Sequence, residues 1–321
     1  MKSFSTENQN YRVSPSTFRK IIRELRANGA LYILALPGVI SLILFSYLPM
    51  AGLVIVFKAY NFQDGIFGSP WVGFQNFRFL VADFPNAWRA TSNTVILNVL
   101  FIFFGTLFAV LIAIIMNEIG CQWVRKLSQS VMFFPYFLSW VAMGSIFQMF
   151  LNDDGILNDI LSLFSIGPVS WYSTPGAWRP ILVIVNLIKN TGYNSIIYFA
   201  ALTGFDTSYY EAAEIDGASR FKRIIYITIP LLMPSIMIMF MLSIGRILSG
   251  DLSMIFGMTN RNPMLFSTTE IIDTYVYRSV LQNGKFEIGS AVTLYQSVFG
   301  FLLVLLSNWL VGKFEKDYRL F

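Results

Sequence analysis

Long apolar segments separated by short polar ones dominate the pattern of the 321-residue chain. A helix needs about 20 apolar residues to cross the hydrocarbon core of a bilayer, and six segments are that long. They are residues 31–57, 94–116, 131–151, 181–202, 224–256 and 288–311. Four contain no charge, whereas the fourth holds Lys189 and the fifth holds Arg246 and Asp251. The pattern predicts an all-α, polytopic membrane protein with six transmembrane helices.

Composition supports this interpretation. Hydrophobic residues make up 55% of the chain and charged residues only 13%, against about 25% charged in soluble domains. An ordinary soluble enzyme and a disordered chain are therefore excluded. Because the chain has one cysteine and no histidine, it cannot form an intrachain disulfide, and it lacks the commonest general base and metal ligand.

The distribution of lysine and arginine predicts the orientation. If the N-terminus lies inside, 14 of the 23 basic residues fall on the cytoplasmic side, 7 fall outside and two lie within the membrane. This bias favours both termini in the cytoplasm. Residues 1–29 are expected to form a basic cytoplasmic tail, in which residues 15–28 are predicted to be either an interfacial amphipathic helix or only a charge cluster. Residues 30–321 are expected to form a single six-span domain.

The link between the fourth and fifth segments carries a spaced motif. It contains Glu-Ala-Ala, three residues, Gly, nine residues and then Ile-x-Ile-Pro. The fixed positions are Glu211, Ala212, Ala213, Gly217, Ile227, Ile229 and Pro230. This link resembles the EAA loop of the membrane subunits of ABC importers, with Ile229 where Leu is usual. The orientation above independently places the link in the cytoplasm.

The resemblance extends from about Ala30 to the C-terminus. The six-segment layout and the stretches WVGFQNF and DDGILND are similar to sugar-importer permeases of the maltose-permease type. The nearest likeness is to the polysaccharide/lipoprotein-type group, which imports complex oligosaccharides. The resemblance implies a coupling loop at about residues 206–230 that docks on an ATP-hydrolysing subunit. Its coupling residues would be Glu211, Ala212, Ala213, Asp216 and Gly217.

The resemblance also implies partners and a location. The chain has no GxxxxGK[ST] phosphate-binding motif, so we expect a non-catalytic subunit without a cofactor of its own. A separate pair of ATP-binding subunits would hold ATP and Mg. The other implied partners are a second, different permease subunit, an extracytoplasmic solute-binding protein and an oligosaccharide substrate, in a bacterial cytoplasmic membrane. No nucleic-acid partner is expected.

Polar residues within the fourth and fifth segments are the candidate substrate path. Residues three or four apart share a face of a helix, and two such stripes on adjacent spans are expected to line one cavity. The candidates are Asn186, Lys189, Asn190, Tyr193, Arg246, Ser249, Gly250 and Ser253. A structural role stays open for the cations, because Lys189 can instead pair with Asp251 or cap a carbonyl.

The intramembrane charges bear on the cargo. Two cations against one anion leave a positive membrane interior, which favours an acidic, uronate-containing oligosaccharide. A neutral oligosaccharide is the alternative. A stand-alone ion-coupled secondary transporter is a further rival, but it needs inverted repeats or broken helices, and neither is evident in the sequence. An intramembrane enzyme is disfavoured by the lack of histidine and of a nucleophile–base pair.

Overall fold

The computed structural model describes residues 26–78, 84–283 and 286–314, and these are almost entirely helical. The chain divides into two compact units, residues 1–54 and 55–321. Within the described ranges, extended pairing is limited to one isolated bridge between Lys58 and Trp71. The all-α expectation is therefore confirmed. The basic tail falls largely on residues 1–25, outside the described residues, and stays a prediction, as does the single domain over 30–321.

The first unit consists of one helical run. Its parts are α2 (Gly29–Leu42), the π-helical turn η1 (Ile43–Tyr47), α3 (Leu48–Met50) and the 3-10 turn η2 (Ala51–Phe57), which continues past the end of the unit. The π-turn precedes Pro49, which has no N–H to donate to the regular helical ladder. Apolar side chains such as Leu34 are exposed along the run, as expected of a helix that faces lipid.

The second unit is built around four long helices. They are α6 (Phe84–Glu118), α10 (Trp178–Thr203), α13 (Ile229–Ile244) and α17 (Phe286–Phe314). The shorter helices are α4 (Gly65–Gly68), α7 (Gln122–Phe133), α8 (Trp140–Leu151), α9 (Ile156–Leu163), α11 (Ser208–Ile215), α12 (Arg220–Arg223), α14 (Leu252–Thr259), α15 (Phe266–Thr269) and α16 (Ile272–Asn283). The 3-10 turns are η3 (Gly73–Arg78), η4 (Phe134–Phe137), η5 (Trp171–Ser173), η6 (Pro175–Ala177) and η8 (Pro263–Leu265), and η7 (Ile224–Thr228) is a π-turn.

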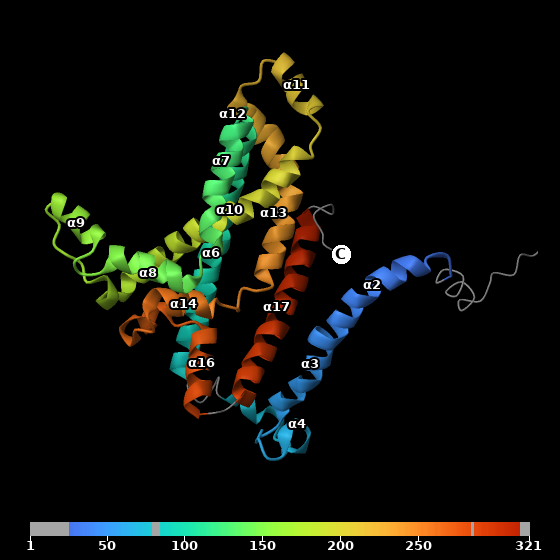
Figure 1. The fold of residues 1–321 in the computed structure, drawn as a ribbon, viewed down its shortest axis with the longest axis vertical. Coiled ribbons are helices and arrows are strands. Elements are labelled where there is room, and N and C mark those ends of the chain that lie inside the picture. The colour runs from blue at the N-terminus through green and yellow to red at the C-terminus, as the bar shows by residue number, and fades with distance from the viewer. Residues whose placement is uncertain (1–25, 79–83, 284–285, 315–321) are drawn as a thin grey trace, which may run out of the picture. The chain divides into compact units, whose positions relative to one another are not determined.

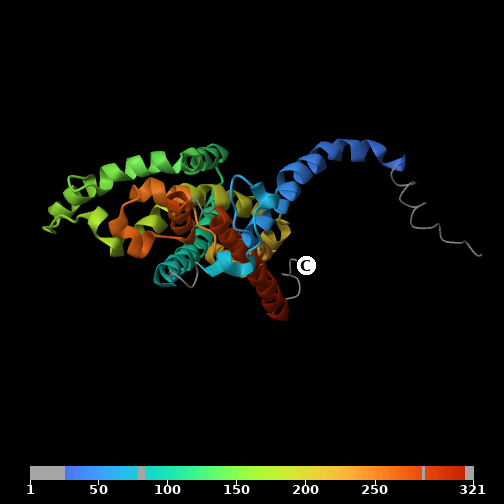
Figure 2. The ribbon, with the colours of Figure 1, turned by 90° about the horizontal axis from the view of Figure 1, so that it is seen from below.

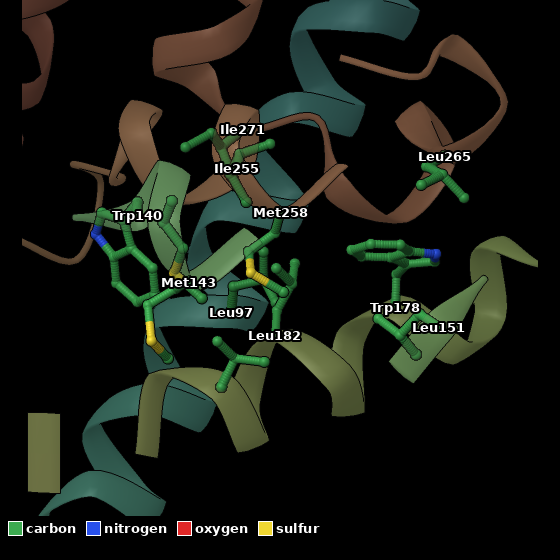
Figure 3. Packing of buried hydrophobic residues seen from close by; sticks show 12 residues of the cluster. Leu97, Trp140, Met143, Leu151, Trp178, Leu182, Ile255, Met258, Leu265 and Ile271 are labelled. Atoms are coloured by element: carbon green, nitrogen blue, oxygen red, sulfur yellow. The ribbon is translucent and has the colours of Figure 1, made fainter. Parts of the chain in front are cut away.

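The main core lies where α10 packs on α6, α8 and α14. Trp178 and Leu182 of α10 are completely buried, together with Leu97 of α6 and Met258 of α14 (Figure 3). Burying each of these large side chains contributes about 1.5–3 kcal/mol where water is the alternative. The core therefore fixes α10 against the two short helices α8 and α14.

Two of the six expected spans are not continuous helices. Residues 131–151 bend by 99° between Gln122–Phe137 and Trp140–Leu163. Pro135 cannot donate an N–H, Leu138 is extended, and Ser139 caps α8 by accepting the N–H of Ala142 at 3.1 Å.

The second interruption lies in residues 224–256, where the helix ends at Ile244. Asp251 caps α14 by accepting the N–H of Met254 at 3.0 Å. The hydrophobicity of the sequence does not predict either break, because both breaks lie within apolar segments.

The number of spans stays a prediction. In the described part of the chain, four helices are long and apolar enough to cross a membrane, and the bent pair would be a fifth. The four are Gly29–Phe57, Phe84–Glu118, Arg220–Ile244 and Phe286–Lys313. Helix α10 has 26 residues, about 39 Å at 1.5 Å per residue, so it is long enough to span, but it carries several amides and a lysine.

Helices α8 and α14 cross backbone to backbone. They lie side by side in Figures 1 and 2, α8 in green and α14 in orange. A Cβ atom added to Gly144 of α8 would lie 1.9 Å from the carbonyl oxygen of Gly257 in α14. One added to Gly257 would lie 2.5 Å from the carbonyl oxygen of Trp140. Only glycine fits at this crossing, because the obstacle on each side is the main chain.

Candidate functional site

The first helix break, residues 134–139 between α7 and α8, is held by a lysine from α10. The ammonium of Lys189 donates to the carbonyl oxygens of Tyr136, at 2.8 Å, and Leu138. It also lies 5.7 Å from the ring centre of Tyr136 and 5.1 Å from that of Trp140. A helix that stops leaves carbonyls without intrahelical donors. Lys189, which is buried, supplies donors to them.

The second break, residues 245–251 between α13 and α14, is held by side chains from three other helices. Asn98 of α6 donates to two of its carbonyls, at 2.8 and 3.0 Å. Gln296 of α17 donates to a third at 2.8 Å, and Asp273 of α16 accepts the N–H of Gly250 at 2.7 Å. Unwound backbone at membrane depth requires such partners, since lipid offers none. The break is therefore stabilised by the tertiary structure.

One hydrogen bond joins the two breaks. The indole N–H of Trp140, at the start of α8, donates to a carboxylate oxygen of Asp251, at the start of α14. The other oxygen of Asp251 caps α14 through Met254. Both oxygens of this carboxylate are thus engaged, and its charge is stabilised by the N-terminus of the helix as well.

A polar hollow of about 510 Å³ opens beside the second break, between α6, α10 and the end of α13. Side chains four residues apart on α10 give it a row of amides, and α6 adds one more. The polar lining consists of Asn98, Thr106, Asn186, Asn190, Asn194, Ser243, Arg246, Ser249 and Asp251, with Gly105 and Gly250. Of the candidate path residues, the structure brings Asn186, Asn190, Arg246, Ser249 and Gly250 together here.

The charge in this hollow is divided unequally. Among its lining residues, Arg246 is the one cation and Asp251 the one anion. The carboxylate of Asp251 is already bonded, whereas Arg246 is exposed and has no carboxylate within ion-pair distance in the described part of the chain. The free charge that the hollow offers to a ligand is consequently positive.

The remaining candidates lie elsewhere. Tyr193 stacks on Tyr136 with ring centres 4.2 Å apart, so it faces the first break beside Lys189. Ser253 is exposed on the first turn of α14. A turn of 100° per residue puts positions 186, 190 and 194 on one strip of α10 and positions 189 and 193 on the adjacent strip. The geometry of Lys189 favours the carbonyl-capping alternative over contact with cargo.

Two lining amides were absent from the sequence prediction. Asn194 continues the four-residue spacing of the other α10 amides. This spacing is the feature of the sequence that could have predicted Asn194 as a lining residue. Asn98 lies alone in an apolar segment, and nothing in the sequence connects it with residues 247–249, about 150 positions later.

The predicted coupling loop forms two short helices joined by a tight turn. Gly217 has φ +74°, in the left-handed region. The N–H of Ala218 donates to the carbonyl of Ala213 at 2.9 Å, and that of Gly217 to Glu214 at 3.0 Å. These two bonds form a Schellman motif, which requires a left-handed residue at its centre. The glycine, which follows the C-cap Asp216, therefore ends α11 and redirects the chain into α12.

Both ends of the loop are tied by local contacts. Asp206, before α11, accepts the N–H of Ser208 at 2.9 Å, and this bond lowers the pKa of its carboxyl below the usual value. Glu214 and Arg223 form an ion pair at 3.0 Å across the turn. The ion pair thus connects the end of α11 with the end of α12.

The surface of the loop is open. Glu211, Ala212 and Asp216 are exposed, and Ile215 and Phe221 are 87% and 71% exposed. Figure 1 shows α11 at the end of the second unit remote from α16. Large apolar side chains exposed together on a turn are typical of a surface that another protein covers.

Broken apolar helices around a polar hollow are typical of membrane transporters. Residues 105–319 match the family described as "Binding-protein-dependent transport system inner membrane component". The chain belongs to this family. The resemblance, the membrane location and the ABC-permease fold predicted from the sequence are confirmed.

Known relatives share most of the chain. It is 33% identical to Protein LplB of Bacillus subtilis (strain 168), over 91% of this chain and 92% of the relative. It is 33% identical to the polygalacturonan/rhamnogalacturonan transport system permease protein YteP of the same organism, over 93% and 92%. A solved bacterial ABC transporter involved in the import of the acidic polysaccharide alginate matches with a TM-score of 0.81 and 30% identity. That match covers 92% of this chain and 99% of the solved one.

The helix breaks correct one expectation. The sequence shows no broken helix, which disfavours a stand-alone secondary transporter, yet the structure contains two breaks. Helix breaks beside a polar hollow are therefore not diagnostic of secondary transport. Membership of a binding-protein-dependent family is what excludes that rival.

Proposed function

We propose that this chain is a permease subunit of an ATP-driven importer for an acidic, uronate-containing oligosaccharide. Family membership supports the importer class. The names of two matched proteins, a polygalacturonan/rhamnogalacturonan permease and an alginate importer, support an acidic cargo. A neutral oligosaccharide is the second candidate, since other relatives include a trehalose/maltose permease of Thermococcus litoralis, 28% identical.

The observation that carries the proposal is the composition of the hollow. Amides donate to and accept from sugar hydroxyls, and Asn186, Asn190 and Asn194 present them in a row. A guanidinium binds a carboxylate through two parallel hydrogen bonds. Arg246 is the one arginine that lines the hollow, and it forms no ion pair in the described part of the chain. A hollow with several amides and one unpaired arginine suits a hydroxyl-rich ligand that carries carboxylates.

The chain would act without covalent chemistry. Two copies of a separate ATP-binding subunit would hold ATP and Mg, a second and different permease would complete the path, and an extracytoplasmic binding protein would deliver cargo. A matched structure contains an alginate importer with a periplasmic protein that holds an alginate pentasaccharide. In this proposal the coupling surface consists of Glu211, Ala212, Ala213, Asp216 and Gly217.

The test compares substrates in the complete complex. We would measure uptake of a uronate trimer and of its neutral, carboxyl-reduced analogue into vesicles for the wild type, Arg246→Gln and Arg246→Lys. A lost charge-assisted hydrogen bond corresponds to about 1.5–3 kcal/mol, so Arg246→Gln should lower uronate uptake about 10-fold or more and spare the neutral sugar. Arg246→Lys keeps the charge and should recover part of the loss. Equal losses for both substrates would overturn the acidic cargo and favour the neutral oligosaccharide.

A further inference from the structure

A second hollow lies apart from the proposed path. It has a volume of about 490 Å³ and is formed by the end of α14, the turn after it, α15 and α16. None of the described residues that line it also lines the first hollow. Apart from Phe256, its lining residues belong to residues 257–287, which the charge pattern predicts to lie outside the membrane. Two arginines, Arg261 and Arg278, and three aromatic rings form much of its wall.

Arg261 is held in an unusual backbone position. Asn260 and Arg261 have φ +52° and +56°, and consecutive left-handed residues other than glycine are rare and concentrate at functional sites. The following residue, Asn262, fixes the turn by donating to the carbonyl of Tyr172 at 2.7 Å. Asn260 and Arg261 therefore have a strained backbone conformation, and the turn that they form positions the side chain of Arg261.

The guanidinium of Arg261 is oriented but has no counter-ion. It lies 4.7 Å from the ring centre of Phe256 and 5.9 Å from that of Tyr277. In the described part of the chain no carboxylate is within ion-pair distance of it. A guanidinium that lies over a ring face keeps N–H groups available to a ligand.

Arg278 adds to the positive charge. It pairs with Glu270 at 2.5 Å, but the same carboxylate also pairs with Arg89 at 2.6 Å. Glu270 also lines the hollow, but its side chain is only 1% exposed and its single negative charge is shared by two cations. The hollow thus combines an unpaired arginine, an incompletely neutralised one and aromatic walls.

We propose that this outer hollow is a second binding site for a carboxylate-bearing sugar residue of the cargo, with Arg261 as its principal contact. Sites for small molecules usually enclose about 300–1,000 Å³ and combine apolar walls with a few convergent polar groups, and this hollow has both properties. The inference rests on the proposed function, because an acidic cargo is what would supply the carboxylate. It adds a subsite before the cargo reaches Arg246.

The test isolates the outer site. We would purify the complete complex in lipid nanodiscs without the binding protein and measure the affinity of the uronate trimer and of its neutral analogue by calorimetry. The Arg246→Gln background weakens the inner hollow, and Arg261→Gln is then added to it. The matched control is Arg78→Gln, which removes an exposed arginine of η3 that lines neither hollow. Elution of each variant as a monodisperse complex verifies folding.

The proposal expects Arg261→Gln to weaken binding of the uronate about 10-fold, with no change for the neutral analogue or for Arg78→Gln. If Arg246→Gln weakens uronate binding but Arg261→Gln does not, the proposed function stands and the outer site is refuted. If the wild-type complex does not distinguish the two sugars, both fail. If Arg261→Gln leaves uronate affinity unchanged but, in a separate titration with the sugar-free binding protein, weakens docking of that protein, the hollow recognises protein and the proposal is wrong.

Discussion

Replacing Lys189 by methionine separates a structural lysine from one that contacts cargo. Methionine preserves most of the length of the stem and removes only the ammonium donors. Two backbone carbonyls of the first break, those of Tyr136 and Leu138, would then lose their partner. An unsatisfied buried polar group costs about 1–3 kcal/mol. Both bonds are partly buried, so the change should destabilise the chain by up to about 2–6 kcal/mol, against the about 5–15 kcal/mol that stabilises a typical fold.

The assay is thermal unfolding of the purified complex, followed by fluorescence-detected size exclusion. At about 2–4 °C per kcal/mol for domains of 150–250 residues, a loss of even 2–3 kcal/mol should lower the midpoint by about 4–12 °C. The matched variant is Arg246→Met, which also removes an intramembrane cation but breaks no ion pair in the described structure. Its midpoint should stay close to that of the wild type.

The same two variants give opposite expectations for transport. Lys189→Met should reduce the uptake of a uronate and of its neutral analogue by one common factor, in proportion to the complex that survives, whereas Arg246→Met should be selective. A wild-type midpoint for Lys189→Met together with selective loss of the uronate would refute the reasoning, because the lysine would then face the cargo.

Three further outcomes are expected. Gly217→Val forces a β-branched residue to φ +74° at a cost of at least about 1–2 kcal/mol, so uptake and transport-linked ATP hydrolysis should fall at normal abundance; normal uptake at normal abundance would argue against a coupling role. Asn98→Ala removes two hydrogen bonds to the second break and should lower the unfolding midpoint of the complex, whereas Ser253→Ala, at an exposed site, should not; equal midpoints for both variants would show that the break is held by other contacts. The chain reconstituted alone should neither hydrolyse ATP nor accumulate sugar on an ion gradient, and gradient-driven accumulation would revive the secondary transporter.

Features that depend on sequence periodicity or on neighbouring residues could be predicted from the sequence. The apolar segments located the helices, and the spacing from Glu211 to Pro230 located a loop whose turn at Gly217 has the left-handed backbone that the motif suggests. The amide spacing on α10 indicated part of a polar wall, and the structure places Asn186 and Asn190 in it.

The two helix breaks could not be predicted, because the residues that stabilise them are distant from them in the sequence. A helix interrupted in apolar surroundings is stable only if other elements satisfy its free backbone groups. The donors and acceptors that do so, such as Lys189 for residues 134–139 and Gln296 for the break after α13, are about 50 positions away. Tertiary packing also decides which face of α10 lies toward each break, and the hydrophobicity of the sequence does not predict this orientation. Tyr193 and Lys189 were therefore grouped with amides from which the fold separates them.

The crossing of α8 and α14 has a consequence for genetics. A clash between two side chains can be relieved by a second mutation that shortens one of them, which is how intragenic suppressors usually arise. At Gly144 and Gly257 the opposing atoms belong to the main chain, and glycine has no side chain left to shorten. A defect caused by Gly144→Ala should therefore yield true revertants, and no suppressor at position 257, in a selection for restored growth on the transported sugar.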